Sequence, residues 1–217
     1  MPAAAARDVV GAGLVPARFF PQYVPMPDHV RYDPAKHHRR SIRLKGYDYS
    51  QPGLYFLTII AQDRRCLFGE VSGGELLSSD VGRMIALAWQ CLPKRFPTIE
   101  LDSSVVMPNH LHGIVVLNRP KPRATTRVAP TIGDVVGAFK SLTTVEFVRG
   151  ARELRWPRLR TLLWQRNYYE HILRDGQPLD RAREYILTNP ARWEHDRENP
   201  DARNPEPDPD WLGLPLL

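Results

Sequence analysis

Short runs of β-branched and aromatic residues recur along the middle of the chain and predict β-strands. The first run covers 53–61 (GLYFLTIIA) and is apolar almost throughout, which is typical of a buried strand. Apolar residues on both sides of Gly73 and Gly74 predict a hairpin within 67–77. Further strands are expected at 99–106, 111–117 and 162–173.

Between these strands, apolar residues follow the spacing of amphipathic helices. A stretch that begins at the capping residues Ser79 and Asp80 predicts a helix that Pro93 should end. Two more helices are expected at 131–149 and 179–187. Strands and helices in this order predict an α+β fold, with an antiparallel sheet that packs its helices on one face.

The two ends of the chain differ from this folded body at 41–195. Residues 1–40 lack a regular apolar period and end in a basic cluster, so we expect a flexible basic N-terminal arm. Residues 196–217 combine six acidic residues with five prolines and predict an extended acidic tail. Trp211 could anchor this tail on a basic surface of the body.

Composition narrows the class of protein. The chain has 217 residues, 42% of them hydrophobic, and no stretch approaches the ~18 apolar residues of a membrane-spanning helix. Cys66 and Cys91 alone exclude a disulfide scaffold and a multi-thiolate zinc site, and they are typical of a cytoplasmic protein. The formal net charge of +6 favours a polyanionic partner, so we expect a nucleic-acid-binding, nucleoid-associated protein.

Two pairs of polar residues could carry chemistry. On a strand, His110 and His112 project to one face and Leu111 to the other, so the imidazoles could bind a divalent metal together. Tyr185 and Asn189 are four residues apart and share one face of a helix. Each pair also has a plain structural interpretation, as polar residues at a strand start and at a helix end.

Four stretches give the chain a resemblance to a known family. They are MPNHLHGIVVL (107–117), VVGAFKSLTT (135–144), LWQRNYYEHILRD (163–175) and REYILTNPARW (183–193). In this order they resemble the REP-associated tyrosine transposases, a branch of the HUH single-strand transposases. The resemblance implies a ferredoxin-like HUH endonuclease fold. It also implies metal-dependent cleavage and rejoining of single-stranded DNA through a covalent 5′-phosphotyrosine.

The resemblance also implies roles for residues. His110 and His112 match the family's metal-binding histidines, Tyr185 its nucleophile, and Asn189 its third metal ligand, with Mg²⁺ or Mn²⁺ as the ion. Imidazole ligands suit Mn²⁺ better than Mg²⁺. Residues expected to shape the site, or to rival Tyr185, are Tyr168, Tyr169 and His171. Arg181 or Arg183 could stabilise a phenolate, or lie on a solvated helix face.

Basic and aromatic residues are expected to bind the DNA, which the resemblance implies to be single-stranded with REP-like hairpins. They are Arg43, Lys45, Arg119, Lys121, Arg123, Lys140, Arg158, Arg160, Trp164 and Arg166. The alternative function is a non-catalytic module that binds DNA or RNA hairpins. No stable protein partner is expected, and the sequence leaves monomer and homodimer, and hence cis and trans catalysis, open.

Overall fold

A computed structural model describes residues 48–119, 130–173, 176–207 and 209. The expected N-terminal arm lies outside these residues, as do four of the expected DNA-binding residues. These four are Arg43, Lys45, Lys121 and Arg123. Within the described ranges, no helix has both the length and the apolar character needed to cross a bilayer.

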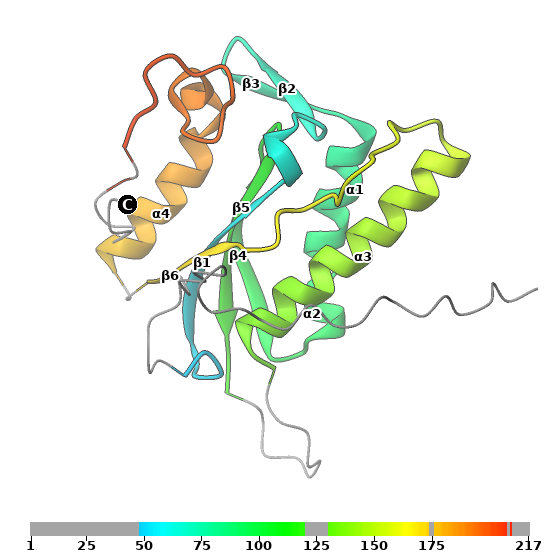
Figure 1. Ribbon diagram of the computed structural model, residues 1–217. Helices are drawn as coiled ribbons and strands as arrows, with labels where there is room; N and C mark the ends of the chain where they lie inside the picture. Colours follow the sequence, from blue (N-terminus) through cyan, green and yellow to red (C-terminus); the bar gives the residue numbers. More distant parts are fainter. Residues whose placement is uncertain (1–47, 120–129, 174–175, 208, 210–217) are drawn as a thin grey trace, which may run out of the picture. The chain divides into compact units, whose positions relative to one another are not determined.

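A four-stranded antiparallel sheet forms the centre of the described fold (Figure 1). Its strands are β1 (Gly53–Ile60), β4 (Ile99–Val106), β5 (His110–Leu117) and β6 (Tyr169–Leu173), in the order β4-β5-β1-β6. Helix α1 (Asp80–Gln90) follows β1 and helix α3 (Ile132–Glu153) follows β5. This order of helices and strands is the ferredoxin-like arrangement, so the predicted α+β class and antiparallel sheet are confirmed.

The two faces of the sheet carry different layers (Figure 1). Tyr55, Leu57 and Ile59 of β1 join the large core with residues of α1 and α3. Phe56, which alternates with them, lies on the opposite face beside helix α4 (Gln177–Thr188). The prediction that the helices pack on one face therefore holds for α1 and α3. Helix α4 is the exception, because its buried apolar side chains pack against Phe56 on the opposite face of the sheet.

Local sequence determines most element boundaries. Ser79 caps α1, and its side chain accepts a hydrogen bond from the Gly82 amide at 3.0 Å. Strands β2 (Gly69–Ser72) and β3 (Glu75–Ser78) flank Gly73 and Gly74, whose φ angles are +60° and +80°. Both angles lie in the left-handed region, where glycine has no steric penalty. The predicted hairpin is thus present.

Several boundaries differ from the prediction, most of them by one or two residues. Helix α1 ends at Gln90, and Pro93 lies in the first turn of a short helix, α2 (Leu92–Arg95), where its missing amide costs nothing. Helix α3 continues four residues past the expected end, to Glu153. Strand β6 begins at Tyr169 rather than at residue 162. Before it, the chain pairs with the sheet only through an isolated bridge between Trp164 and Ala61. Short 3-10 helices cover η1 (Gln62–Arg64) and η2 (Pro190–His195).

Gly113 makes close packing of α1 on β5 possible. A Cβ at this position would lie 2.4 Å from Cζ2 of Trp89, which is buried on the face covered by α1 and α3. Residue 113 also directly follows His112, so a shift of the strand here would move that imidazole.

We expect Gly113→Ala to lower the free energy of unfolding by about 1–3 kcal/mol, because the added methyl group overpacks the core. The matched control is Gly137→Ala on an exposed turn of α3, where a Cβ meets nothing within 4 Å. It should gain about 0.5–1 kcal/mol from helix propensity. Urea denaturation of both variants measures the difference, and equal stabilities would contradict the packing argument.

Candidate active site

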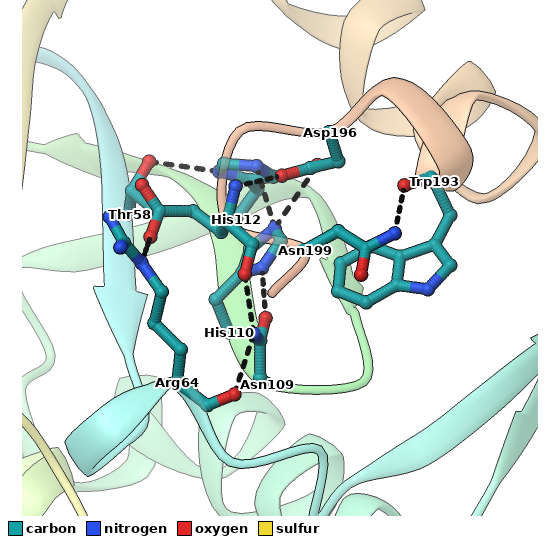
Figure 2. Close-up of polar contacts among 9 residues, drawn as sticks. Thr58, Arg64, Asn109, His110, His112, Trp193, Asp196 and Asn199 are labelled. Atoms are coloured by element: carbon teal, nitrogen blue, oxygen red, sulfur yellow. Dashed lines mark hydrogen bonds and ion pairs between the residues drawn. The ribbon is translucent and has the colours of Figure 1, made fainter. Parts of the chain in front are cut away.

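The two histidines lie on β5 with their side chains on the α4 face of the sheet. His110 has no exposed surface and His112 is 4% exposed, while Leu111 between them is buried in the core of the opposite face. The expected alternation along this strand is therefore confirmed. Figure 2 shows both imidazoles directed toward each other and toward the segment that follows α4.

Neighbouring polar side chains hold the Nδ1 atom of each imidazole (Figure 2). The Asn109 amide nitrogen donates to the backbone carbonyls of Arg64 and Glu198, so its Oδ1 must accept from His110 Nδ1–H, at 2.9 Å. The Nε2 atom of neutral His110 then carries a lone pair. His112 Nδ1 lies 2.9 Å from the Thr58 hydroxyl, which can donate or accept.

The two Nε2 atoms face each other at 3.0 Å. Burial lowers the pKa of His112 to about 3, and burial together with the neighbouring His112 lowers the pKa of His110 well below its ordinary value. Both imidazoles are therefore neutral near pH 7, the form that binds metals. Two lone pairs at this separation repel each other, so either one proton or a cation must lie between the rings.

An acidic residue completes a cluster of possible metal ligands. Asp196 Oδ2 lies 3.8 Å from His110 Nε2, and the ligand atoms of Asp196 and both histidines all lie within 4.8 Å of one another. The composition of 196–217 predicts an extended tail that begins at Asp196, and it gives no sign of this contact. Residues 196–206 instead include two turns, place Asp196 beside His110, and return toward η2, where Glu206 N–H donates to the His195 carbonyl at 2.8 Å.

Asn189 lies at the end of α4, and its side chain fits the role of an oxygen ligand. It is 2% exposed, and its Oδ1 has no hydrogen-bond donor among the residues that the structure describes. A buried amide oxygen without a donor costs about 1–3 kcal/mol, which a bound cation would offset. Asn189 lines a pocket of about 320 Å³ together with Tyr185 and Asp196. The donors present here therefore fit a divalent cation.

Tyr185 stands beside the histidines. Its ring centroid lies 5.3 Å from that of His112 and 6.0 Å from that of Phe56, and the Arg192 guanidinium lies 5.9 Å from the ring centre. The sequence gives no signal for Arg192. The short helix η2 after α4 brings its guanidinium over the tyrosine ring, and the order of apolar and polar residues does not predict this turn.

A cavity of about 540 Å³ opens beside Tyr185 and His112. Tyr169 and His171 line it too, whereas the ring of Tyr168 lies 5.5 Å from Lys140 Nζ and packs against the core of the other face. The structure thus brings two of the three expected accessory residues to the cavity.

Helix α4 is tied to β4 by an ion pair between Arg183 and Asp102, with an N–O distance of 2.7 Å. The pairing register of β4 shifts between Leu101 and Ser104, and such an irregularity can redirect a side chain. The Arg183 hydrogen bond lowers the pKa of Asp102 to about 2. Arg183, one of two residues considered as a phenolate partner, instead holds the helix in place.

Two expected DNA-binding residues have internal roles. Trp164 is 3% exposed and its Nε1–H donates to Thr143 Oγ1 at 2.8 Å, so it belongs to the core and cannot stack on bases. Lys140 Nζ donates to the backbone carbonyls of Gln165 and Asn167, each at 2.8 Å, and burial lowers its pKa to about 8. Its ammonium group supports the loop before β6. The exposed members of the set are Arg119, Arg158, Arg160 and Arg166.

Two known proteins are similar to this chain in sequence. No family model matches the chain. An uncharacterized protein of Haemophilus influenzae is 37% identical over 183 residues, covering 77% of this chain and 96% of that protein. A protein of the same organism named "Putative REP-associated tyrosine transposase" is 24% identical over 182 residues, covering 78% of this chain and 93% of that protein.

Two solved structures are also similar. One is a REP-associated tyrosine transposase bound to a REP hairpin, with 20% identity, a TM-score of 0.48, and coverage of 69% of this chain and 73% of that one. The other is a transposase-like protein of Deinococcus radiodurans, with 18% identity, a TM-score of 0.39, and coverage of 68% and 96%.

The Asp102–Arg183 pair predicts a pH-dependent contribution to stability. Folding lowers the pKa of Asp102 from 3.8 to about 2, so the contribution is complete above about pH 4 and is lost as the pH falls through about 2. We expect Arg183→Met to lower the thermal midpoint at about pH 6 and the difference from wild type to shrink between pH 4 and pH 2. Thermal melts across this range measure it.

The control for this series is Arg149→Met, which removes an exposed pair with Glu146 within α3. Exposed pairs of this kind contribute little, so the control should change the midpoint only slightly. A difference between wild type and Arg183→Met that stays constant down to about pH 2 would contradict the role of the Asp102 carboxylate.

Proposed function

We propose that this chain is a REP-associated tyrosine transposase, as its similarity to a protein of that name suggests, and that it cuts and rejoins single-stranded DNA through Tyr185. The observation that carries the proposal is the position of Tyr185, whose ring lies 5.3 Å from His112 at the edge of the cavity. Tyr185 and His112 line this cavity, His110 faces His112 at 3.0 Å, and Asn189 with its buried amide oxygen lines a neighbouring pocket together with Tyr185. This set of groups suits covalent phosphoryl transfer by the tyrosine.

His110, His112 and Asn189 are the residues that would hold a divalent cation. When bound, this ion would neutralise negative charge on the scissile phosphate, which otherwise repels a nucleophile. Two imidazoles and an amide oxygen favour Mn²⁺ over Mg²⁺. Thr58 and Asn109 hold the rings from behind, so that both Nε2 atoms stay directed into the site.

Tyr185 performs the covalent step. Its phenolic oxygen forms a bond to phosphorus as the bond from phosphorus to the 3′-oxygen breaks, giving a 5′-phosphotyrosine and a free 3′-hydroxyl. One phosphoester bond replaces another, so the 3′-hydroxyl of the same or another strand can reverse the step. The phenol, with an ordinary pKa of about 10, must lose its proton during attack. Arg192, whose guanidinium lies 5.9 Å from the ring centre and pairs with Glu206, is the cation placed to balance the developing negative charge.

Exposed arginines would hold the DNA. We propose that Arg119, Arg158, Arg160 and Arg166 contact phosphates of a REP-like hairpin and its single-stranded flank. The proposed setting is the bacterial nucleoid, where such hairpins occur.

The first test is a denaturing gel with a labelled REP-hairpin oligonucleotide, Mn²⁺ or EDTA, and single tyrosine variants. Wild type and Tyr169→Phe should form an adduct that survives denaturation in Mn²⁺ and disappears in EDTA. Tyr185→Phe should form none, because phenylalanine has no nucleophilic oxygen.

An adduct that persists in Tyr185→Phe would move the nucleophile to Tyr168 or Tyr169. A hairpin shift on a native gel without any adduct in Mn²⁺ would instead favour the non-catalytic binding module.

The arginines give a second prediction. The double variant Arg158→Gln, Arg160→Gln should bind the hairpin more weakly, and the slope of log affinity against log salt should fall in magnitude by about 2. Arg83→Gln is the control, since Arg83 on α1 pairs with Asp80 and donates to the Ser78 carbonyl of β3. Fluorescence anisotropy over a salt series measures both, and an equal loss in the control would contradict a specific contact.

A further inference from the structure

Asp196 reaches the histidines from a different part of the chain than any ligand named above. We infer that Asp196 is a fourth protein ligand of the cation, and that the cation fastens the segment 196–206 to β5. The inference rests on the proposed function for the presence of a divalent ion, but it concerns a residue outside the four matching stretches.

Hydrogen bonds and burial fix the position of the Asp196 side chain. The residue directly follows η2, and its backbone amide donates to the Trp193 carbonyl at 3.1 Å. Its Oδ1 accepts from the Glu198 amide at 2.6 Å, which leaves Oδ2 facing His110 (Figure 2). The side chain is only 5% exposed. A carboxylate in so dry a place has a strong preference for a nearby cation.

The separations fit shared coordination. Bonds of about 2.1 Å place ligand atoms around a first-row divalent ion about 3 to 4 Å apart. The two Nε2 atoms are 3.0 Å apart, and Oδ2 of Asp196 is 3.8 Å from that of His110. A hydrogen bond does not explain the second distance, because 3.8 Å exceeds the range of an N–H···O bond and His110 donates its Nδ1 proton to Asn109. Asp196 adds the formal negative charge that the other three ligands lack.

The same segment supports the histidine from behind. The Glu198 carbonyl accepts from Asn109 at 2.6 Å, and the Glu198 carboxylate pairs with Arg64 at 2.7 Å. Asn109 in turn sets the proton position of His110. Cation binding and packing of the segment are therefore coupled, since each stabilises the arrangement that the other needs.

The test titrates Mn²⁺ into the full chain without DNA by calorimetry. Asp196→Asn should weaken Mn²⁺ binding by about 10- to 100-fold or more, because it removes a charged ligand and keeps the shape. Glu198→Gln, which weakens the anchor of the segment to Arg64 but keeps Asp196, should weaken Mn²⁺ binding by much less than Asp196→Asn does. Glu206→Gln, which removes the exposed pair with Arg192, should bind Mn²⁺ nearly as wild type does. Thermal melts without metal check that each variant is folded.

Limited proteolysis gives a second readout. Trypsin can cut at the exposed Arg197 and Arg203, and Mn²⁺ should slow these cuts in wild type but not in Asp196→Asn. Unchanged Mn²⁺ affinity in Asp196→Asn would overturn the inference, and so would an equal loss in Glu198→Gln, which would assign the effect to packing. The absence of any adduct in wild type would refute the proposed function alone, because neither of these measurements uses DNA.

Discussion

The arrangement of the site depends on two buried imidazoles whose Nε2 atoms face each other at 3.0 Å. Burial keeps both rings neutral, so the structure must supply a proton or a cation between them. The hydroxyl of Thr58 can serve either state. If it donates to Nδ1, His112 carries its proton on Nε2 and donates to His110; if it accepts, His112 presents a lone pair to a metal. Thr58 thus lets one site exist with and without an ion.

The sheet that carries the two imidazoles has two unequal faces. The face under α1 and α3 carries the large aromatic core, and Gly113 lets Trp89 pack tightly against the strand that holds the histidines. The opposite face buries only a small apolar cluster around Phe56 and leaves the rest to polar side chains. Rigidity comes from the first face, which is how catalytic groups can be held accurately on the second.

The sequence predicts those parts of the molecule that local pattern controls. Strand β4 has the expected bounds, and Ser79 begins α1 as expected, because alternation and capping act over a few residues. Trp164 and Lys140 were assigned to the surface because an aromatic among basic residues is typical of nucleic-acid binding. Their burial depends on Thr143 and on loop carbonyls that only the folded chain brings near. The sequence did not predict the contact between Asp196 and the histidines, because an acidic, proline-rich composition is typical of an extended segment.

The chemistry therefore depends on how three separate segments meet. Strand β5 supplies the imidazoles, α4 the tyrosine and amide, and the chain after η2 the carboxylate. Two partly exposed ion pairs hold these segments. Arg183 on α4 pairs with Asp102 on β4, and Glu198 after η2 pairs with Arg64 on η1. Such pairs contribute only about 0–1 kcal/mol each. Their effect is better understood as positional, because each fixes the direction of a segment that has few buried apolar residues. They thus add to the apolar contacts of α4 and to the hydrogen bonds after η2 in holding Tyr185 and Asp196 beside the histidines.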